Sequence, residues 1–166
     1  MEYVYLTKED ILEYHNDIIN EIGGSHGVRE EGGIERIVDF IQNDLYYPTL
    51  VDKLTYLVFG LCSGHYFMDG NKRISIVAAA HFLIKNKKLW AGARFFEYFH
   101  SYAWHIAAGN IDKDLFARIV DCYINNREMD ESLKLEILHA ISKGQICDEE
   151  EICTDRERQV DHRVGQ

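Results

Sequence analysis

The chain has 166 residues, 46% of them hydrophobic, which is enough for one globular domain with a hydrophobic core. Its 28 acidic residues outnumber its 18 lysines and arginines, and the formal net charge is −10. Because an acidic surface repels phosphate backbones, we expect no direct nucleic-acid binding.

Neither export nor membrane insertion is expected. No apolar run approaches the roughly 18 residues needed to span a membrane, and the first residues lack the basic and apolar regions of a signal peptide. The cysteines contain no CxxC pair, which predicts reduced thiols rather than a zinc site or a disulfide framework. They are Cys62, Cys122, Cys147 and Cys153. Together these features predict a cytoplasmic protein.

Apolar residues recur at helical spacing along nearly the whole chain, which predicts an all-α fold. The predicted helices cover residues 8–22, 33–44, 51–63, 71–86, 94–108, 113–125 and 128–143. Thr7 is suited to cap the first helix, and Gly23 and Gly24 are suited to end it. Beyond the last helix, an acidic run leads into a polar tail that we expect to be frayed.

The helix predicted over residues 71–86 is apolar almost all round, as expected for a helix at the centre of a bundle. Aromatic residues in the following helix also have helical spacing, so they are predicted to lie in the core rather than to form a base-stacking face. These are Phe95, Phe96, Tyr98, Phe99, Tyr102 and Trp104.

Residues 65–73, His-Tyr-Phe-Met-Asp-Gly-Asn-Lys-Arg, form a loop that leads into the N-terminus of this apolar helix. A helix N-terminus offers unpaired N–H groups and a partial positive charge, so it binds anions. Gly70 allows a ligand to approach the backbone closely, and Lys72 and Arg73 add cationic groups for a phosphate. Asp69 is a hard oxygen ligand suited to Mg²⁺. His65 is of the residue type that titrates near neutrality and serves as a general base.

Taken singly, each of these residues has a structural explanation, and Phe67 is predicted to anchor the loop in the core. The joint pattern resembles the motif of the Fic family, HxFx(D/E)GN(G/K)R, at every specified position. Its Asn-Lys-Arg ending resembles the Doc branch, the toxins of death-on-curing toxin–antitoxin pairs. The resemblance implies a Fic/Doc catalytic domain over residues 1–126, built as a compact helical bundle in which the motif loop enters a buried central helix. Residues 127–166 would then be a C-terminal helical extension and acidic polar tail.

The resemblance also implies a role for each motif residue. His65 would be the catalytic base that activates a hydroxyl of a target protein, and Asp69 would hold Mg²⁺. The remaining motif residues would bind the phosphates of ATP: Gly70, Asn71, Lys72 and Arg73.

The motif ending also bears on the reaction. Doc toxins phosphorylate elongation factor Tu, whereas family members with Asn-Gly-Arg transfer AMP; here Lys72 stands in place of that Gly, and Ile76 in place of their second Arg. The resemblance therefore implies transfer of the ATP γ-phosphoryl group to a Ser or Thr hydroxyl of a translation protein such as elongation factor Tu. Protein adenylylation and a non-enzymatic interaction module are the alternatives. An antitoxin protein is the expected partner, and residues 46–49 form either a target-docking flap or a simple connector.

Overall fold

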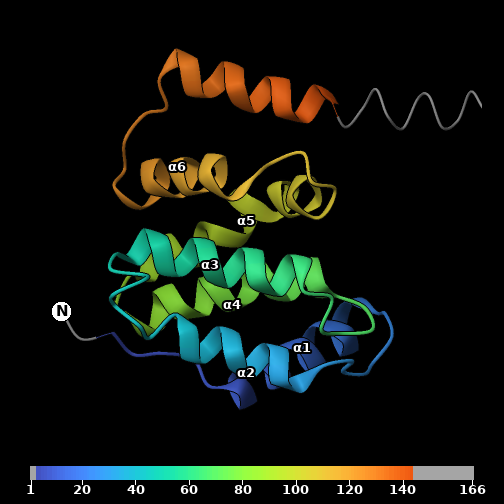
Figure 1. Ribbon diagram of the computed structural model, residues 1–166. Coiled ribbons are helices and arrows are strands. Elements are labelled where there is room, and N and C mark those ends of the chain that lie inside the picture. The colour runs from blue at the N-terminus through green and yellow to red at the C-terminus, as the bar shows by residue number, and fades with distance from the viewer. Residues whose placement is uncertain (1–2, 144–166) are drawn as a thin grey trace, which may run out of the picture. The chain divides into compact units, whose positions relative to one another are not determined.

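The computed structural model describes residues 3–143, and this part of the chain is helical, as predicted (Figure 1). The helices are α1 (Lys8–Ile22), α2 (Glu31–Phe40), α3 (Leu50–Ser63), α4 (Asn71–Lys85), α5 (Leu89–Ala107) and α6 (Lys113–Ile124). Another helical stretch covers residues 131–143. Within residues 3–143 the extended pairing amounts to one isolated bridge between Val28 and Phe67.

The chain divides into two compact units, Met1–Met129 and Asp130–Gln166. In the second unit, the side chain of Asp130 accepts a hydrogen bond of 2.7 Å from the backbone N–H of Leu133. This cap explains why the helix begins at residue 131 and not at 128 as predicted. The predicted polar tail, together with Cys147 and Cys153, lies outside the described residues, while Cys62 and Cys122 are both free thiols.

Helix α4 occupies the centre of the first unit, where it contacts α1, α3 and α5 (Figure 1). Its buried positions lie on several sides of the helix, as the predicted central position requires. Helix α5 begins at Leu89, five residues before the predicted start, and Gly92 lies inside it. A Cβ at Gly92 would lie 2.5 Å from Cγ1 of Ile84 and 2.8 Å from the carbonyl oxygen of Ala80. This glycine therefore permits close packing of α5 on α4 rather than breaking the helix.

The turn between α2 and α3 is stabilised by a buried lysine. Helix α2 ends at Phe40, earlier than the predicted 44, and the chain then turns. The Lys53 ammonium, 0% exposed, donates hydrogen bonds to the carbonyl oxygen of Ile41 at 2.8 Å and to Oδ1 of Asp44 at 2.7 Å. These bonds compensate the buried charge and satisfy a carbonyl that has left the helix.

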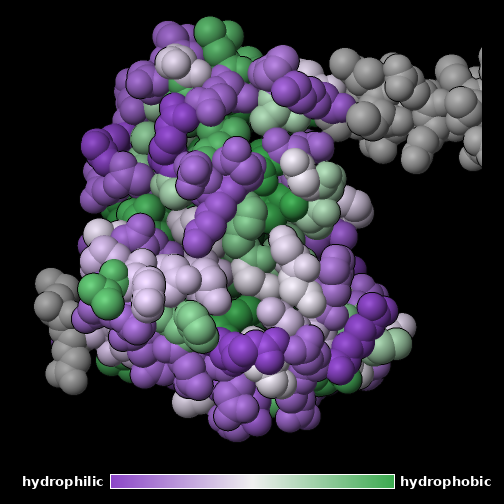
Figure 2. All heavy atoms as spheres, viewed as in Figure 1, coloured by the Kyte–Doolittle hydropathy of each residue, from purple (hydrophilic) through white to green (hydrophobic). Residues whose placement is uncertain are grey.

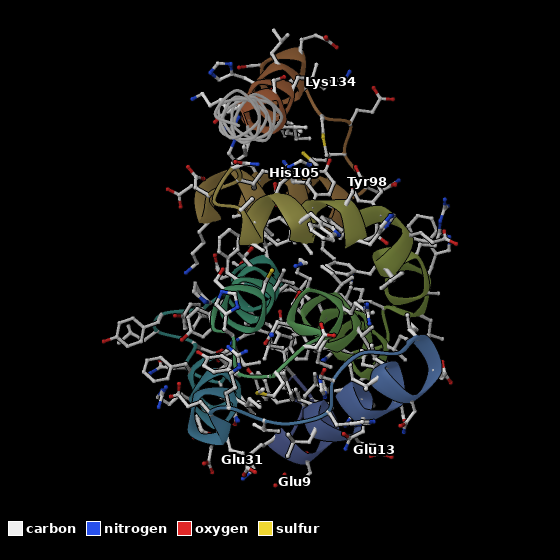
Figure 3. The ribbon with its side chains drawn as sticks, turned by 90° about the vertical axis from the view of Figure 1, so that its right-hand side faces the viewer. Glu9, Glu13, Glu31, Tyr98, His105 and Lys134 are labelled. Carbon is white, nitrogen blue, oxygen red and sulfur yellow. The ribbon has the colours of Figure 1, made fainter. Side chains whose placement is uncertain are left out.

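The surface is largely hydrophilic over α1 and α2 on the face shown in Figure 2. Glu9 and Glu13 of α1 and Glu31 of α2 lie at the outer edge of the bundle, directed away from its core (Figure 3). No helix in residues 3–143 has both the length and the apolar composition required to cross a membrane.

Candidate active site

A cavity of about 370 Å³ lies at the N-terminus of α4 and collects most of the predicted site residues. Its lining consists of Cys62, His65, Met68, Asp69, Gly70, Asn71, Lys72, Arg73, Trp104 and Ala107. Of the seven residues predicted from the motif, six line this cavity, and the seventh, Phe67, is fully buried in the core. The loop and the start of α4 therefore present their polar groups to one hollow in the surface.

Gly70 is the residue from which α4 begins. Its φ of +79° is left-handed, a conformation that glycine adopts without strain. It supplies no side-chain cap to the helix, so the N–H groups of the first turn are available to an anion. The start of α4 is thus suited to a phosphate group.

Asn71 directs its side chain back onto the motif loop. Its Oδ1 accepts a hydrogen bond of 3.0 Å from the backbone N–H of Phe67, and its Nδ2 donates one of 2.9 Å to the carbonyl oxygen of the same residue. The amide therefore satisfies both polar groups of a buried backbone segment. The side-chain amide is thus occupied by the loop, and the backbone N–H is the group that Asn71 leaves for an anion.

His65 and Asp69 lie at opposite ends of the motif loop, and both are exposed. His65 has a φ of +50°, which is uncommon for a residue other than glycine and is often found at functional sites. The Asp69 carboxylate accepts backbone N–H bonds from Gly70 at 2.6 Å and from Ser25 at 3.4 Å. These bonds, the one from Gly70 first, lower the pKa of Asp69 below its usual range, so they favour the charged carboxylate.

The surroundings of Asp69 are suited to a cation that takes one ligand from this carboxylate and most of the others from water and a bound substrate. No group of three or more histidine, cysteine, aspartate or glutamate side chains within residues 3–143 is arranged to hold a metal ion. An ionised, exposed carboxylate beside a phosphate-binding helix terminus fits Mg²⁺, which typically uses one or two carboxylates together with water and substrate phosphates.

The two cationic side chains of the motif have partners within the protein. The Lys72 ammonium lies 4.2 Å from the ring centroid of Trp104, and Arg73 donates a hydrogen bond of 2.9 Å to the carbonyl oxygen of Gly23. Such exposed cation–π contacts are worth only about 0.5–1 kcal/mol, so the contact with Trp104 is a weak restraint on the Lys72 ammonium.

Trp104 was predicted to lie in the core, but this prediction is wrong because 66% of its surface is exposed. Phe95 and Phe99 are fully buried, and they lie one helical turn apart on the inward face of α5. The core prediction is also wrong for Phe96 and Tyr98, which are 40% and 42% exposed. Trp104 lies two turns after Phe96 on the outward face. The spacing of Trp104 from Phe95 and Phe99 is the signal in the sequence that indicates the outward face.

Segment 23–30 runs beside the motif loop. The N–H of Arg29 donates to the carbonyl oxygen of Tyr66 at 2.6 Å, and the N–H of Met68 donates to that of Gly27 at 3.0 Å. Gly24 also approaches the site, since an added Cβ would lie 2.7 Å from Oδ2 of Asp69. Residues 46–49 are not among those that line the cavity.

His15 lies on the buried face of α1, and no role in the site was predicted for it from the sequence. It is 1% exposed, and its Nε2 lies 2.8 Å from the carbonyl oxygen of Asp69. Its ring stacks on Phe67 with centroids 3.9 Å apart. Nothing in the local sequence around His15 indicates these contacts, because its partners lie more than 50 residues away.

Comparison with known proteins agrees with the motif and its setting. Residues 5–83 match the model of the Fic/DOC family. The protein kinase doc of Escherichia phage P1 is 31% identical over 86 residues, a match that covers 49% of this chain and 68% of the relative. The matched stretch contains α1 to α3, the motif loop and most of α4. The chain therefore belongs to the Fic/DOC family.

Proposed function

We propose that the chain is a Doc-like toxin that transfers the γ-phosphoryl group of ATP to a Ser or Thr hydroxyl of a translation protein such as elongation factor Tu. The observation that carries this proposal is the cavity that brings His65 and Asp69 together with the cationic start of α4. The name of the phage relative, a protein kinase, supports phosphoryl transfer as the chemistry.

In this proposal each part of the cavity has one task. His65 accepts the proton of the attacking hydroxyl, whose oxygen forms a new bond to the γ-phosphorus while the bond to the β–γ bridging oxygen breaks and ADP leaves. The N-terminus of α4, with Lys72 and Arg73, holds the phosphates in place. Asp69 would hold Mg²⁺, which when bound neutralises phosphate charge.

Two positions favour γ-phosphoryl over adenylyl transfer. Lys72 stands where adenylyl-transferring relatives have Gly, and it adds bulk and charge at the start of α4. Ile76 stands where those relatives have a second Arg, and its side chain is 0% exposed. This position therefore provides no cationic partner for a second phosphate in the cavity.

The decisive experiment uses ATP labelled at either the α- or the γ-phosphate. The protein is incubated with Mg²⁺ and a cell extract, and separately with purified elongation factor Tu. Transfer of γ-label to one protein band, lost in His65→Ala, is expected. Transfer of α-label would show adenylylation instead, and no transfer of either label would favour a non-enzymatic module.

The toxin proposal includes an antitoxin protein as partner. It predicts that expression of this chain alone arrests growth, that His65→Ala abolishes the arrest, and that a neighbouring open reading frame encodes a protein that neutralises it. Growth arrest by a well-folded His65→Ala protein would contradict the assigned role of His65.

A further inference from the structure

His15 lies against three residues of the motif loop, Phe67, Asp69 and Gly70. Its Nε2 lies 2.8 Å from the carbonyl oxygen of Asp69, and its ring is stacked on Phe67 at an interplanar angle of 15°. A Cβ added to Gly70 would lie 3.2 Å from the same Nε2. The ring thus fills the space directly beneath the turn from which α4 begins.

The chemistry of the hydrogen bond fixes the proton on this ring. A carbonyl oxygen only accepts, so Nε2 of His15 must carry the hydrogen that it donates to Asp69. Stacking on Phe67 defines the plane of the ring, and the burial of His15 prevents water from replacing the bond. The two contacts together determine the orientation of the peptide that joins Asp69 to Gly70.

That peptide connects the two functions assigned to this end of the cavity. The N–H of this peptide, on Gly70, donates to the Asp69 carboxylate at 2.6 Å. Gly70 itself has a left-handed backbone conformation and is the residue from which α4 begins. A rotation of the peptide would move both the carboxylate and the first N–H groups of the helix. The end of α1 is tied to α4 as well, since Arg73 donates to the carbonyl oxygen of Gly23.

We propose that His15 is a positioning residue that holds the Asp69–Gly70 peptide so that the carboxylate and the start of α4 act on the same Mg²⁺–nucleotide. This inference rests on the function proposed above. Replacing a residue that hydrogen-bonds to a metal ligand and orients it typically weakens metal affinity about 10–100-fold. Replacing a purely structural residue lowers stability alone.

Three variants separate the contributions of His15. His15→Gln retains an N–H donor but loses the stacked ring, His15→Phe retains the ring but loses the donor, and His15→Leu loses both. Ile11→Ala is the matched control, because Ile11 is a fully buried residue one turn earlier in α1. It lowers stability through packing alone.

The first measurement is the affinity of each variant for Mn²⁺ in the presence of a non-hydrolysable ATP analogue, with electron paramagnetic resonance as the readout. Thermal unfolding of each variant measures its stability. We expect His15→Phe and His15→Leu to bind about 10–100-fold more weakly, His15→Gln to recover part of this loss, and Ile11→Ala to bind as the wild type does. In kinetics, His15→Phe should lower kcat as well as raise KM. If the Mn²⁺–nucleotide affinity of all the variants, Ile11→Ala included, falls only in proportion to their loss of stability, the proposal is overturned.

The second measurement does not depend on nucleotide binding or activity. In ¹⁵N–¹H spectra, the imidazole should show an Nε2–H, and the Gly70 amide should shift in His15→Phe but not in Ile11→Ala. An Nδ1–H tautomer, or an unchanged Gly70 amide, would overturn the proposal. If the wild type fails to bind Mn²⁺–nucleotide, the proposed function is refuted along with the task assigned to His15, while these spectra still decide whether His15 orients the peptide.

Discussion

Replacement of Asn71 by alanine tests whether this residue acts on the loop or on the phosphate. The variant loses two hydrogen bonds to the backbone of Phe67, at 3.0 and 2.9 Å. At about 0.5–1.5 kcal/mol each, these bonds contribute about 1–3 kcal/mol. The better helix propensity of alanine offsets up to about 0.7 kcal/mol of this. At the mid-range value of about 2 kcal/mol for the two bonds together, we therefore expect a net destabilisation of about 1.3–2 kcal/mol.

The assay is urea unfolding followed by tryptophan fluorescence, because both tryptophans, Trp90 and Trp104, belong to the unit Met1–Met129. Lys72→Ala is the control: its side chain contacts Trp104 at the surface, so its loss should cost no more than about 1 kcal/mol. That variant should instead bind ATP more weakly. If Asn71→Ala unfolds within about 0.5 kcal/mol of the wild type and yet loses ATP binding, the Asn71 side chain acts on the phosphate and our assignment is wrong.

Three further predictions concern packing, ligand binding and pH. Gly33→Ala places a Cβ 2.0 Å from the Tyr66 ring, so we expect urea unfolding to show a loss of about 1–3 kcal/mol. ATP binding should change the fluorescence of Trp104, because Lys72 leaves its ring to contact phosphate. Burial lowers the pKa of His81 below the usual value for histidine, about 6.5, so the unfolded chain takes up the proton first as the pH falls. The contribution of this ring to stability is therefore complete above that value and is lost as the pH falls through the folded pKa; His81→Phe should lose less stability between about pH 7.5 and 5.5.

Each of these predictions has a control or an outcome that contradicts it. Gly32→Ala lies in the same helix with room for a Cβ, 3.7 Å from the nearest side-chain atom, and should not destabilise the protein. The ATP-dependent signal should persist in Trp90→Phe and vanish in Trp104→Phe; a signal carried by Trp90 would contradict our account. Thermal unfolding of His81→Phe with the same pH dependence as the wild type would show that this histidine does not couple folding to pH.

Features of this protein that depend on near neighbours along the chain were predictable from its sequence. Helical spacing indicated the all-α fold, and Thr7 caps α1 as predicted, with Asp10 completing the capping box. The motif was recognisable because nine consecutive residues carry it, and a turn that enters a helix brings such residues together whatever surrounds them. Six of the seven predicted residues accordingly line one cavity.

Features that depend on partners in other parts of the chain became apparent from the folded protein. The end of α2 and the start of α5 depend on Lys53 and Gly92, whose partners lie outside their own helices. The exposure of Trp104 depends on which face of α5 turns toward α4. His15 reaches Asp69 across 54 positions of sequence. Hydrophobic periodicity indicates that a residue is buried but not what it is buried against, and it is this packing of α1 beneath the motif loop that orients the candidate site.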